Sequence, residues 1–370
     1  MSVTERNITV DSIRTVALLA ICVVNLPFIA LPPELALLPG RCFTDQLGAF
    51  ISEVLLQLKF YLLFAFVFGW SVAIQAAAAD RQAVNFKQRY FRRLAVLALF
   101  GCLHAVLVFN GDILLLYALL GALLWPVRQW PLKRLAWLAL AMLPLSLLCL
   151  TLLAVVLDAM PPTNLALPDS SAPGYLQLMA ERLVDWPATF VFLFLLQAPL
   201  AFAAFICGLI AAREQWLVPG SKAMQHLQCL VPLLLLFGLP FNLLFGAVSS
   251  GMLVEPNELL GFIGLVSLGL AAPAMSAVYL YVIVVLSGRI SLSTVWLRAG
   301  QNSLSVYVLQ GVLAGWVSGS YGLGLYGQLD QLQLLPVAVG IALSAMLLVS
   351  GYAYCCGKGP LEQLMKRISA

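Results

Sequence analysis

Ten long apolar segments constrain the fold of this chain more than any other feature of its sequence. Each supplies most of the roughly 20 apolar residues that a helix needs to cross about 30 Å of hydrocarbon. Charged residues make up only 10% of the 370 residues, against about 25% in an ordinary soluble domain. We therefore expect an all-α fold, a polytopic transmembrane helical bundle, with residues 1–370 in a single transmembrane domain. The expected spans are approximately residues 12–31, 50–75, 92–109, 112–127, 135–157, 187–211, 227–247, 259–287, 301–319 and 333–355.

The positions of lysine and arginine predict the orientation of these spans. If the N-terminus is cytoplasmic, 17 of the 20 basic residues fall in inner segments. Arg41 and Arg182 fall in outer segments, and Lys59 falls inside the second span. Because basic residues concentrate on the cytoplasmic side, we expect both termini in the cytoplasm. So few charges exclude a nucleic-acid-binding protein and leave the lipid bilayer as the expected partner.

Polar side chains inside spans are costly in lipid and are therefore the first functional candidates. Arg14 and Asn25 lie 11 residues apart in the first span, close to three helical turns, so they share a face and are separated by roughly 16 Å. Arg14 either faces an anionic ligand or lies among lipid phosphates. Asn25 either lines a cavity or bonds a neighbouring helix. The sequence leaves both alternatives open.

His104 is the only histidine inside a predicted span. Counted along their helices, Asn25, Gln197 and Gln310 come out at a similar depth, which predicts a polar layer near the middle of the bilayer. Histidine exchanges a proton near neutral pH, so His104 suits a general base. The alternative is a neutral imidazole that bonds a carbonyl and locks two helices together. A single histidine predicts no metal site.

Three further features each allow two interpretations. Asp112, between the third and fourth spans, either caps the following helix or orients His104. Lys59 either extends its ammonium group outward or contacts a ligand. The basic run from Arg81 to Arg93, which includes Arg92, either marks the inner side or holds the phosphates of a soluble cofactor.

Several short segments, in order along nearly the whole chain, resemble the YeiB family of bacterial inner-membrane proteins. The matching segments are Arg6-Asn7-Ile8, Asp11-Ser12-Ile13-Arg14, Asn25, Lys59-Phe60, Leu63-Phe64, Phe68-Gly69, Gly101, His104, Gly111-Asp112-Ile113-Leu114, Tyr117, Gly300-Gln301-Asn302-Ser303-Leu304, Tyr307, Gln310 and Gly359-Pro360-Leu361-Glu362. The resemblance implies a multi-pass protein of the bacterial inner membrane.

The YeiB family in turn looks like a branch of the transmembrane acyltransferase superfamily. That group includes heparan-α-glucosaminide N-acetyltransferase and sugar O-acyltransferases of bacterial envelopes. The resemblance implies transfer of an acyl (acetyl) group from cytoplasmic acyl-CoA to an envelope glycan or lipid acceptor. Arg14 matches the first-span arginine of the O-acyltransferases. Their histidine position is Asn25 here, and that of the heparan-modifying enzymes is Ala36, so His104 would act as the base from another span.

Three functions therefore remain as hypotheses. In an acyltransferase, Arg14, Arg92 and Arg93 would hold CoA phosphates, and His104 would deprotonate the acceptor. Asn25 would bind the developing oxyanion, and Asp112 would complete the catalytic set. The residues expected to contact the acceptor are Lys59, Tyr117, Gln197 and Gln310. The alternatives are a transporter or permease for a small solute, which suits a midplane polar layer, and a non-catalytic membrane partner protein. The sequence carries no signal for the oligomeric state.

Overall fold

The computed structural model describes residues 8–82, 85–159, 174–218, 220–253, 257–290 and 292–369. Arg6 and Asn7 of the family resemblance lie outside these residues. Within the described ranges the chain is helical and contains no strand, so the predicted all-α fold is confirmed. The helices are α1 (Ile8–Ala30), α2 (Pro33–Leu37), α3 (Phe43–Leu55), α4 (Lys59–Gln82), α5 (Phe86–Leu107), α6 (Leu114–Val127), α7 (Leu132–Asp158), α8 (Tyr175–Arg213), α9 (Lys222–Ser249), α10 (Glu258–Ser287), α11 (Thr294–Gln301), α12 (Ser303–Ser318), α13 (Gln331–Cys356) and α14 (Pro360–Ser369).

Each of the ten predicted segments overlaps a helix, and the second, residues 50–75, overlaps two, α3 and α4. Eight helical stretches in the described ranges are long and apolar enough to cross a membrane. The fourth and ninth predicted spans correspond to α6 and α12, which have 14 and 16 residues and are shorter than the usual span. The protein is thus a helical membrane protein. The number of spans, the cytoplasmic termini and the single domain over residues 1–370 stay predictions.

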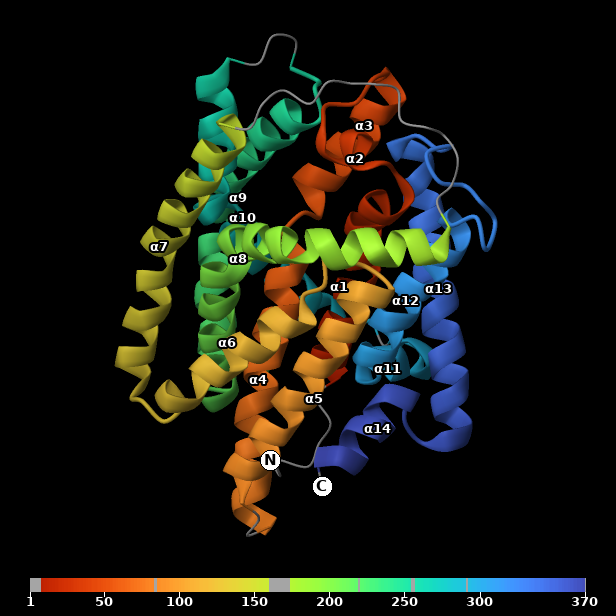
Figure 1. Ribbon diagram of the computed structural model, residues 1–370. Coiled ribbons are helices and arrows are strands. Elements are labelled where there is room, and N and C mark those ends of the chain that lie inside the picture. The colour runs from red at the N-terminus through yellow and green to blue at the C-terminus, as the bar shows by residue number, and fades with distance from the viewer. Residues whose placement is uncertain are drawn as a thin grey trace.

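Helix α1 is the central helix of the bundle (Figure 1). It contacts α4, α10, α11, α12 and α13, and most of its residues are buried. Ile8 at its start and Lys366 of α14 line the same cavity, so the beginning of α1 and the C-terminal helix lie at one end of the bundle (Figure 1). A central α1 means that its polar residues face other helices rather than lipid.

The second predicted span, residues 50–75, is not one continuous helix. The chain breaks between α3 and α4, where Leu58 has a left-handed φ of 63°. In a regular α-helix the amide of Gln57 would donate to the Glu53 carbonyl, but here it donates to the Ser52 carbonyl. The freed Glu53 carbonyl accepts a 2.6 Å hydrogen bond from Lys59 Nζ. Lys59 is fully buried, so the interpretation that its ammonium group extends outward is wrong.

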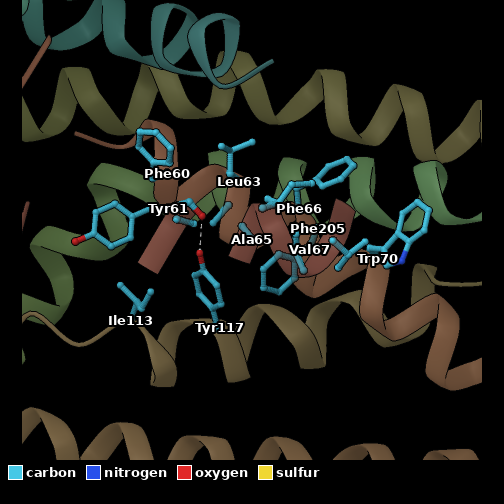
Figure 2. Close-up of a cluster of buried hydrophobic side chains, with 14 of the residues drawn as sticks. Phe60, Tyr61, Leu63, Ala65, Phe66, Val67, Trp70, Ile113, Tyr117 and Phe205 are labelled. Carbon is cyan, nitrogen blue, oxygen red and sulfur yellow. Dashed lines mark hydrogen bonds between the residues drawn. The ribbon is translucent and has the colours of Figure 1, made fainter. Parts of the chain in front are cut away.

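Helices α4 and α8 pack at unusually close range because glycine occupies their contact. A Cβ atom on Gly69 would lie 1.9 Å from the Phe205 carbonyl oxygen, and one on Gly208 would lie 1.9 Å from that of Phe66. Figure 2 shows the aromatic cluster beside this contact, in which Phe205 lies close to Tyr117 of α6. The Tyr117 hydroxyl donates to the Tyr61 carbonyl at 2.7 Å, the dashed line of Figure 2. This cluster fixes α6 against α4 and α8.

The first part of α8 lies across the bundle, and the rest runs alongside α4 (Figure 1). Tyr175 and Arg182 donate to the Leu107 carbonyl, the last of α5, at 3.1 and 3.2 Å. The Tyr175 ring also contacts Tyr321, in the segment between α12 and α13. This part of α8 therefore ties the end of α5 to the end of α12, close to the hairpin that carries Asp112.

Candidate functional site

His104 and Asp112 form a buried hydrogen-bonded pair. His104 Nδ1 lies 2.9 Å from Asp112 Oδ1, and the two side chains are 3% and 1% exposed. The Tyr307 hydroxyl donates to the same carboxylate oxygen at 3.3 Å, and its ring lies 5.1 Å from the imidazole. The carboxylate therefore fixes the orientation of the imidazole, the arrangement that general-base histidines use in hydrolases.

The hairpin between α5 and α6 brings these two residues together. Helix α5 ends just after His104, and the amides of Val108 and Phe109 both donate to the His104 carbonyl. Asp112 Oδ2 then accepts hydrogen bonds from the amides of Leu114 and Leu115 at 2.8 and 3.3 Å. The two interpretations of Asp112 are both correct, since one oxygen caps α6 and the other holds His104.

A glycine allows this hairpin to close. A Cβ atom on Gly101 would lie 2.5 Å from the Leu115 amide nitrogen and 2.9 Å from Asp112 Oδ2. Because real Cβ atoms do not approach other atoms so closely, any larger residue at this position would push α6 and its capping carboxylate away from α5.

A small cavity of about 10 Å³ gathers three residues of the predicted polar layer. Asn25, His104 and Gln310 line it, together with Tyr307 and Gly311. All three side chains are buried. The common depth expected for these residues is correct, and they come from three different helices, α1, α5 and α12.

Gln197, the fourth residue expected at this depth, does not line the small cavity. Its side chain is buried in α8, and its Oε1 atom has no hydrogen-bond partner among the described residues. Depth along a helix is insufficient to place a side chain, because the rotation of the helix decides which neighbour it faces.

A second, much larger cavity of about 990 Å³ begins at the end of the bundle where α14 lies. Six cationic side chains line it, whereas the carboxylates in its lining are Asp11 and Glu362. The cations are Arg14, Arg89, Arg93, Arg213, Lys358 and Lys366. The part formed by Leu18, Ile21 and Tyr117 is apolar and aromatic. The large cavity therefore combines an anion-binding end with an apolar end.

The linings of the two cavities share Tyr307. Tyr307 lines both of them and donates to Asp112. Along α1, the residues up to Ile21 line the large cavity, and those from Cys22 onward line the small one. Arg14 therefore lines the large cavity and Asn25 the small one. Tyr307 lies between the lining of the large cavity and the His104–Asp112 pair.

Two of the three predicted anion-binding residues, Arg14 and Arg93, line the large cavity, and Arg92 does not. Arg14 donates to Ser71 Oγ at 2.6 Å and lies 3.4 Å from Asp11. Arg93 also lines the large cavity, but Arg92 is exposed and does not. Of the basic run, the arginines that line the cavity are therefore Arg89 and Arg93, which share a helix face.

The predicted acceptor-binding residues are scattered. Tyr117 lines the large cavity and Gln310 the small one. Lys59 and Gln197 line neither. Gln310 Nε2 donates to the Leu18 carbonyl at 3.2 Å, which ties α12 to α1 beside the small cavity.

Sequence reasoning missed the contact that holds α14 in place, although both of its segments belong to the family resemblance. Glu362 Oε1 accepts from the amides of Leu304 and Ser305 at 2.9 and 3.1 Å, and Oε2 accepts from Ser305 Oγ at 2.5 Å. The Gly359 amide donates to Asn302 Oδ1 at 2.6 Å. We call these contacts the C-terminal clasp. The sequence does show a glutamate in a short C-terminal segment and polar residues at the start of α12. Neither feature identifies the other as its partner, because the two meet only in the folded protein.

Tyr61 was missed as well. Its hydroxyl donates a short hydrogen bond to Asn25 Oδ1, so the amide oxygen of Asn25 already has a partner. A tyrosine within an aromatic-rich helix gives no sequence signal of such a role. Among the described residues, no group of three or more His, Cys, Asp or Glu side chains gathers as a metal site would require.

Comparison with known proteins finds a family and two relatives whose names assign no activity. A family described as "Protein of unknown function (DUF418)" matches residues 211–370. "Uncharacterized protein YxaH" of Bacillus subtilis (strain 168) is 26% identical over 403 aligned residues, which cover 98% of this chain and 94% of that protein. "Uncharacterized protein YeiB" of Escherichia coli (strain K12) is 32% identical over 133 residues, 33% of this chain and 31% of that protein. No solved structure matches. The predicted resemblance to the YeiB family is confirmed.

Proposed function

From its relationship to the YeiB family and from the two cavities, we propose that this chain is an inner-membrane acyltransferase. It takes an acyl (acetyl) group from acyl-CoA and transfers it to an envelope glycan or lipid acceptor. The observation that carries the proposal is the large cavity, which is cationic near α14 and is lined by Tyr307, the residue that donates to Asp112 of the His104–Asp112 pair. The end of the bundle with α14 then faces the cytoplasm, where acyl-CoA is available.

The lining of the large cavity fits the chemistry of the donor. Acyl-CoA carries several phosphate charges at one end of a long, thin and mostly uncharged arm. Arg14, Arg89 and Arg93 supply guanidinium groups, which bind phosphate by paired hydrogen bonds. Tyr117 and the apolar residues of α1 line the space that the arm would occupy. Glu362 is engaged in the C-terminal clasp, and Asp11 pairs with Arg14 at 3.4 Å. Six cations against two carboxylates give the lining a net positive charge that favours an anion.

His104 acts as the general base in this scheme. Asp112 accepts a hydrogen bond from Nδ1–H, so Nε2 of the neutral imidazole carries the free lone pair. Nε2 removes the proton from the acceptor as it attacks the thioester carbonyl, and it later returns the proton to the leaving sulfur. Asp112 stabilises the imidazolium that forms between these steps. The NH2 group of Asn25, whose oxygen is held by Tyr61, stabilises the negative oxygen of the tetrahedral intermediate.

The test uses the chain's second histidine as a matched control. Purified protein in liposomes receives radiolabelled acetyl-CoA, a panel of hexosamines and hexoses, and the lipids themselves. Release of the CoA thiol and label in the acceptor are both measured. His104→Ala should reduce turnover by about 100-fold or more. His226→Ala should leave turnover unchanged, because His226 is exposed and lines neither cavity. Equal turnover in the two folded variants would overturn the mechanism.

A carrier for a small solute is the second candidate, and discontinuous helices favour it. Helices α3 and α4 are separated by the break at Leu58, and α11 and α12 by Asn302. Carriers bind substrates at such interrupted helices. Protein-dependent flux of a solute into sealed liposomes that contain no acetyl-CoA would support this function, and its absence across a broad solute panel would exclude it.

A further inference from the structure

Two buried polar atoms in the small cavity have no hydrogen-bond partner among the described residues. They are His104 Nε2 and Gln310 Oε1. Buried polar atoms are almost always paired, and leaving one unpaired is costly. Both residues line the small cavity, so one small hydrogen-bond donor placed there would complete their hydrogen bonding.

Both atoms are hydrogen-bond acceptors. His104 Nδ1 lies beside the Asp112 carboxylate, which only accepts, so in the neutral ring Nδ1 carries the hydrogen and Nε2 accepts. Gln310 Nε2 donates to the Leu18 carbonyl, which also only accepts. The orientation of the amide is thereby fixed, and Oε1 is the end left for a ligand.

The small cavity also contains one donor. Asn25 Oδ1 accepts the hydrogen bond from Tyr61, so its NH2 group is the polar end that remains for a ligand. The cavity volume of about 10 Å³ accommodates a group the size of one water molecule. The residues that line the small cavity thus offer two acceptors and one donor.

We propose that the acceptor substrate is a primary amine and that Gln310 selects it over an alcohol. This inference rests on the acyltransferase function proposed above. A free amine carries two hydrogens on the attacking atom, one for His104 Nε2 and one for Gln310 Oε1. An alcohol carries one hydrogen and would leave Gln310 Oε1 unpaired. A site whose polar groups match the substrate discriminates strongly against an analogue that lacks the matching hydrogen.

The reaction balances with groups already named. The amine nitrogen forms a bond to the thioester carbonyl carbon while His104 Nε2 takes one of its hydrogens, and Asn25 binds the negative oxygen. The carbon–sulfur bond then breaks, and His104 returns the proton to sulfur. The products are an amide and the free CoA thiol. Gln310 retains its hydrogen bond to the second hydrogen throughout and is a specificity-determining residue.

The experiment compares matched amine and alcohol probes. Acetyl-CoA is given to the protein in liposomes with glucosamine or glucose, and separately with phosphatidylethanolamine or phosphatidylglycerol of identical chains. The variant is Gln310→Leu, which removes the second acceptor at similar size. The control is Gln197→Leu, because Gln197 is another buried glutamine with an unpaired Oε1 that lines neither cavity. Unfolding temperatures are measured for both variants.

We expect at least one amine of the panel to be acetylated about tenfold or more faster than its matched alcohol. Gln310→Leu should slow amine transfer by about tenfold or more and reduce the preference, whereas Gln197→Leu should keep it. Transfer to alcohols at equal or greater rate would overturn the amine assignment and leave the acyltransferase function standing. Acetate as the product regardless of the probe would also overturn it, since water would then be the acceptor. No thiol release with any probe would remove both proposals. If Gln310→Leu unfolds, Gln310→Glu tests the same point, because it retains an acceptor oxygen and should keep the preference for amines.

Discussion

Asp112→Asn is the substitution that best separates a catalytic role of the His104–Asp112 pair from a structural one. The carboxylate accepts on two sides, from His104 and Tyr307 on Oδ1 and from two backbone amides of α6 on Oδ2. Asparagine has one oxygen and one NH2 group, so it accepts on only one of these sides. The backbone amides have no alternative protonation state, and we therefore expect the asparagine oxygen to cap α6 and the NH2 group to face His104.

The expected effects on stability and on turnover differ sharply. Asparagine and aspartate are about equally good caps, so the free energy of unfolding should change by about 1 kcal/mol or less. With an NH2 group beside it, His104 Nδ1 must accept, and the proton moves to Nε2. Nε2 then cannot remove a proton from the acceptor. Loss of a positioned general base lowers kcat by about 10²- to 10⁴-fold.

The assay is acetyl transfer in liposomes, with the unfolding temperature in detergent measured on the same preparations. The double variant Asp112→Asn with His104→Ala completes the cycle. Because the two residues act as a unit, the turnover of the double variant should equal that of His104→Ala alone to within about twofold. Wild-type turnover in folded Asp112→Asn would refute the reasoning. So would a double variant whose fold-reduction in turnover is the product of the two single reductions.

Other substitutions test the packing that supports the site, each by the unfolding temperature together with acetyl-CoA affinity. Gly69→Val places atoms on the backbone of α8 and should destabilise the protein by about 1–3 kcal/mol, whereas Gly340→Val, where a Cβ atom meets nothing within 4 Å, should be close to neutral. Glu362→Ala removes the carboxylate of the C-terminal clasp, and we expect a loss of about 1–3 kcal/mol. Acetyl-CoA binding should weaken as well, since Lys366 of α14 and Lys358 just before it both line the large cavity. Lys59→Ala empties a fully buried site and should cost about 2–5 kcal/mol without changing acetyl-CoA affinity. Equal losses of stability in the two glycine variants would contradict the close α4–α8 contact. Unchanged acetyl-CoA affinity in Glu362→Ala would contradict the role of the clasp, and weakened acetyl-CoA affinity in Lys59→Ala would contradict a purely structural Lys59.

Two exposed cysteines report the proposed orientation. Cys42 precedes α3, and Cys356 ends α13 next to α14. In single-cysteine variants in intact cells, a membrane-impermeant maleimide should label Cys42 readily, and Cys356 only after the inner membrane is permeabilised. The reverse pattern would place the cationic cavity on the outer face and exclude cytoplasmic acyl-CoA as its ligand.

The helical bundle and three residues of its polar layer follow from the sequence because they depend on local periodicity. Eleven residues bring a helix almost back to the same face, so Arg14 and Asn25 share a face of α1, although they line different cavities. Helix rotation is not visible in the sequence, so depth alone could not show that Gln197 does not line the small cavity. The break before Lys59 was also hidden, because the flanking residues are as apolar as those of a continuous span and the left-handed Leu58 is not a glycine.

Long-range partners were beyond sequence reasoning for the same reason. Glu362 caps α12 from 57 or more residues away, and Tyr307 reaches Asp112 across 195 residues. Nothing local to either segment specifies the partner. For Asp112 the sequence did indicate both roles. They were treated as alternatives, although a carboxylate has two oxygens and performs both.

The most direct test of the central claim is calorimetric binding of acetyl-CoA to the purified protein, with a matched pair of neighbouring arginine variants. Arg93 lines the large cavity, whereas Arg92 is exposed and lies outside its lining. The account predicts saturable binding that weakens by about tenfold or more in Arg93→Gln and stays unchanged in Arg92→Gln. No binding by the folded protein, or equal weakening in both variants, would contradict the claim that this cavity holds the acyl donor.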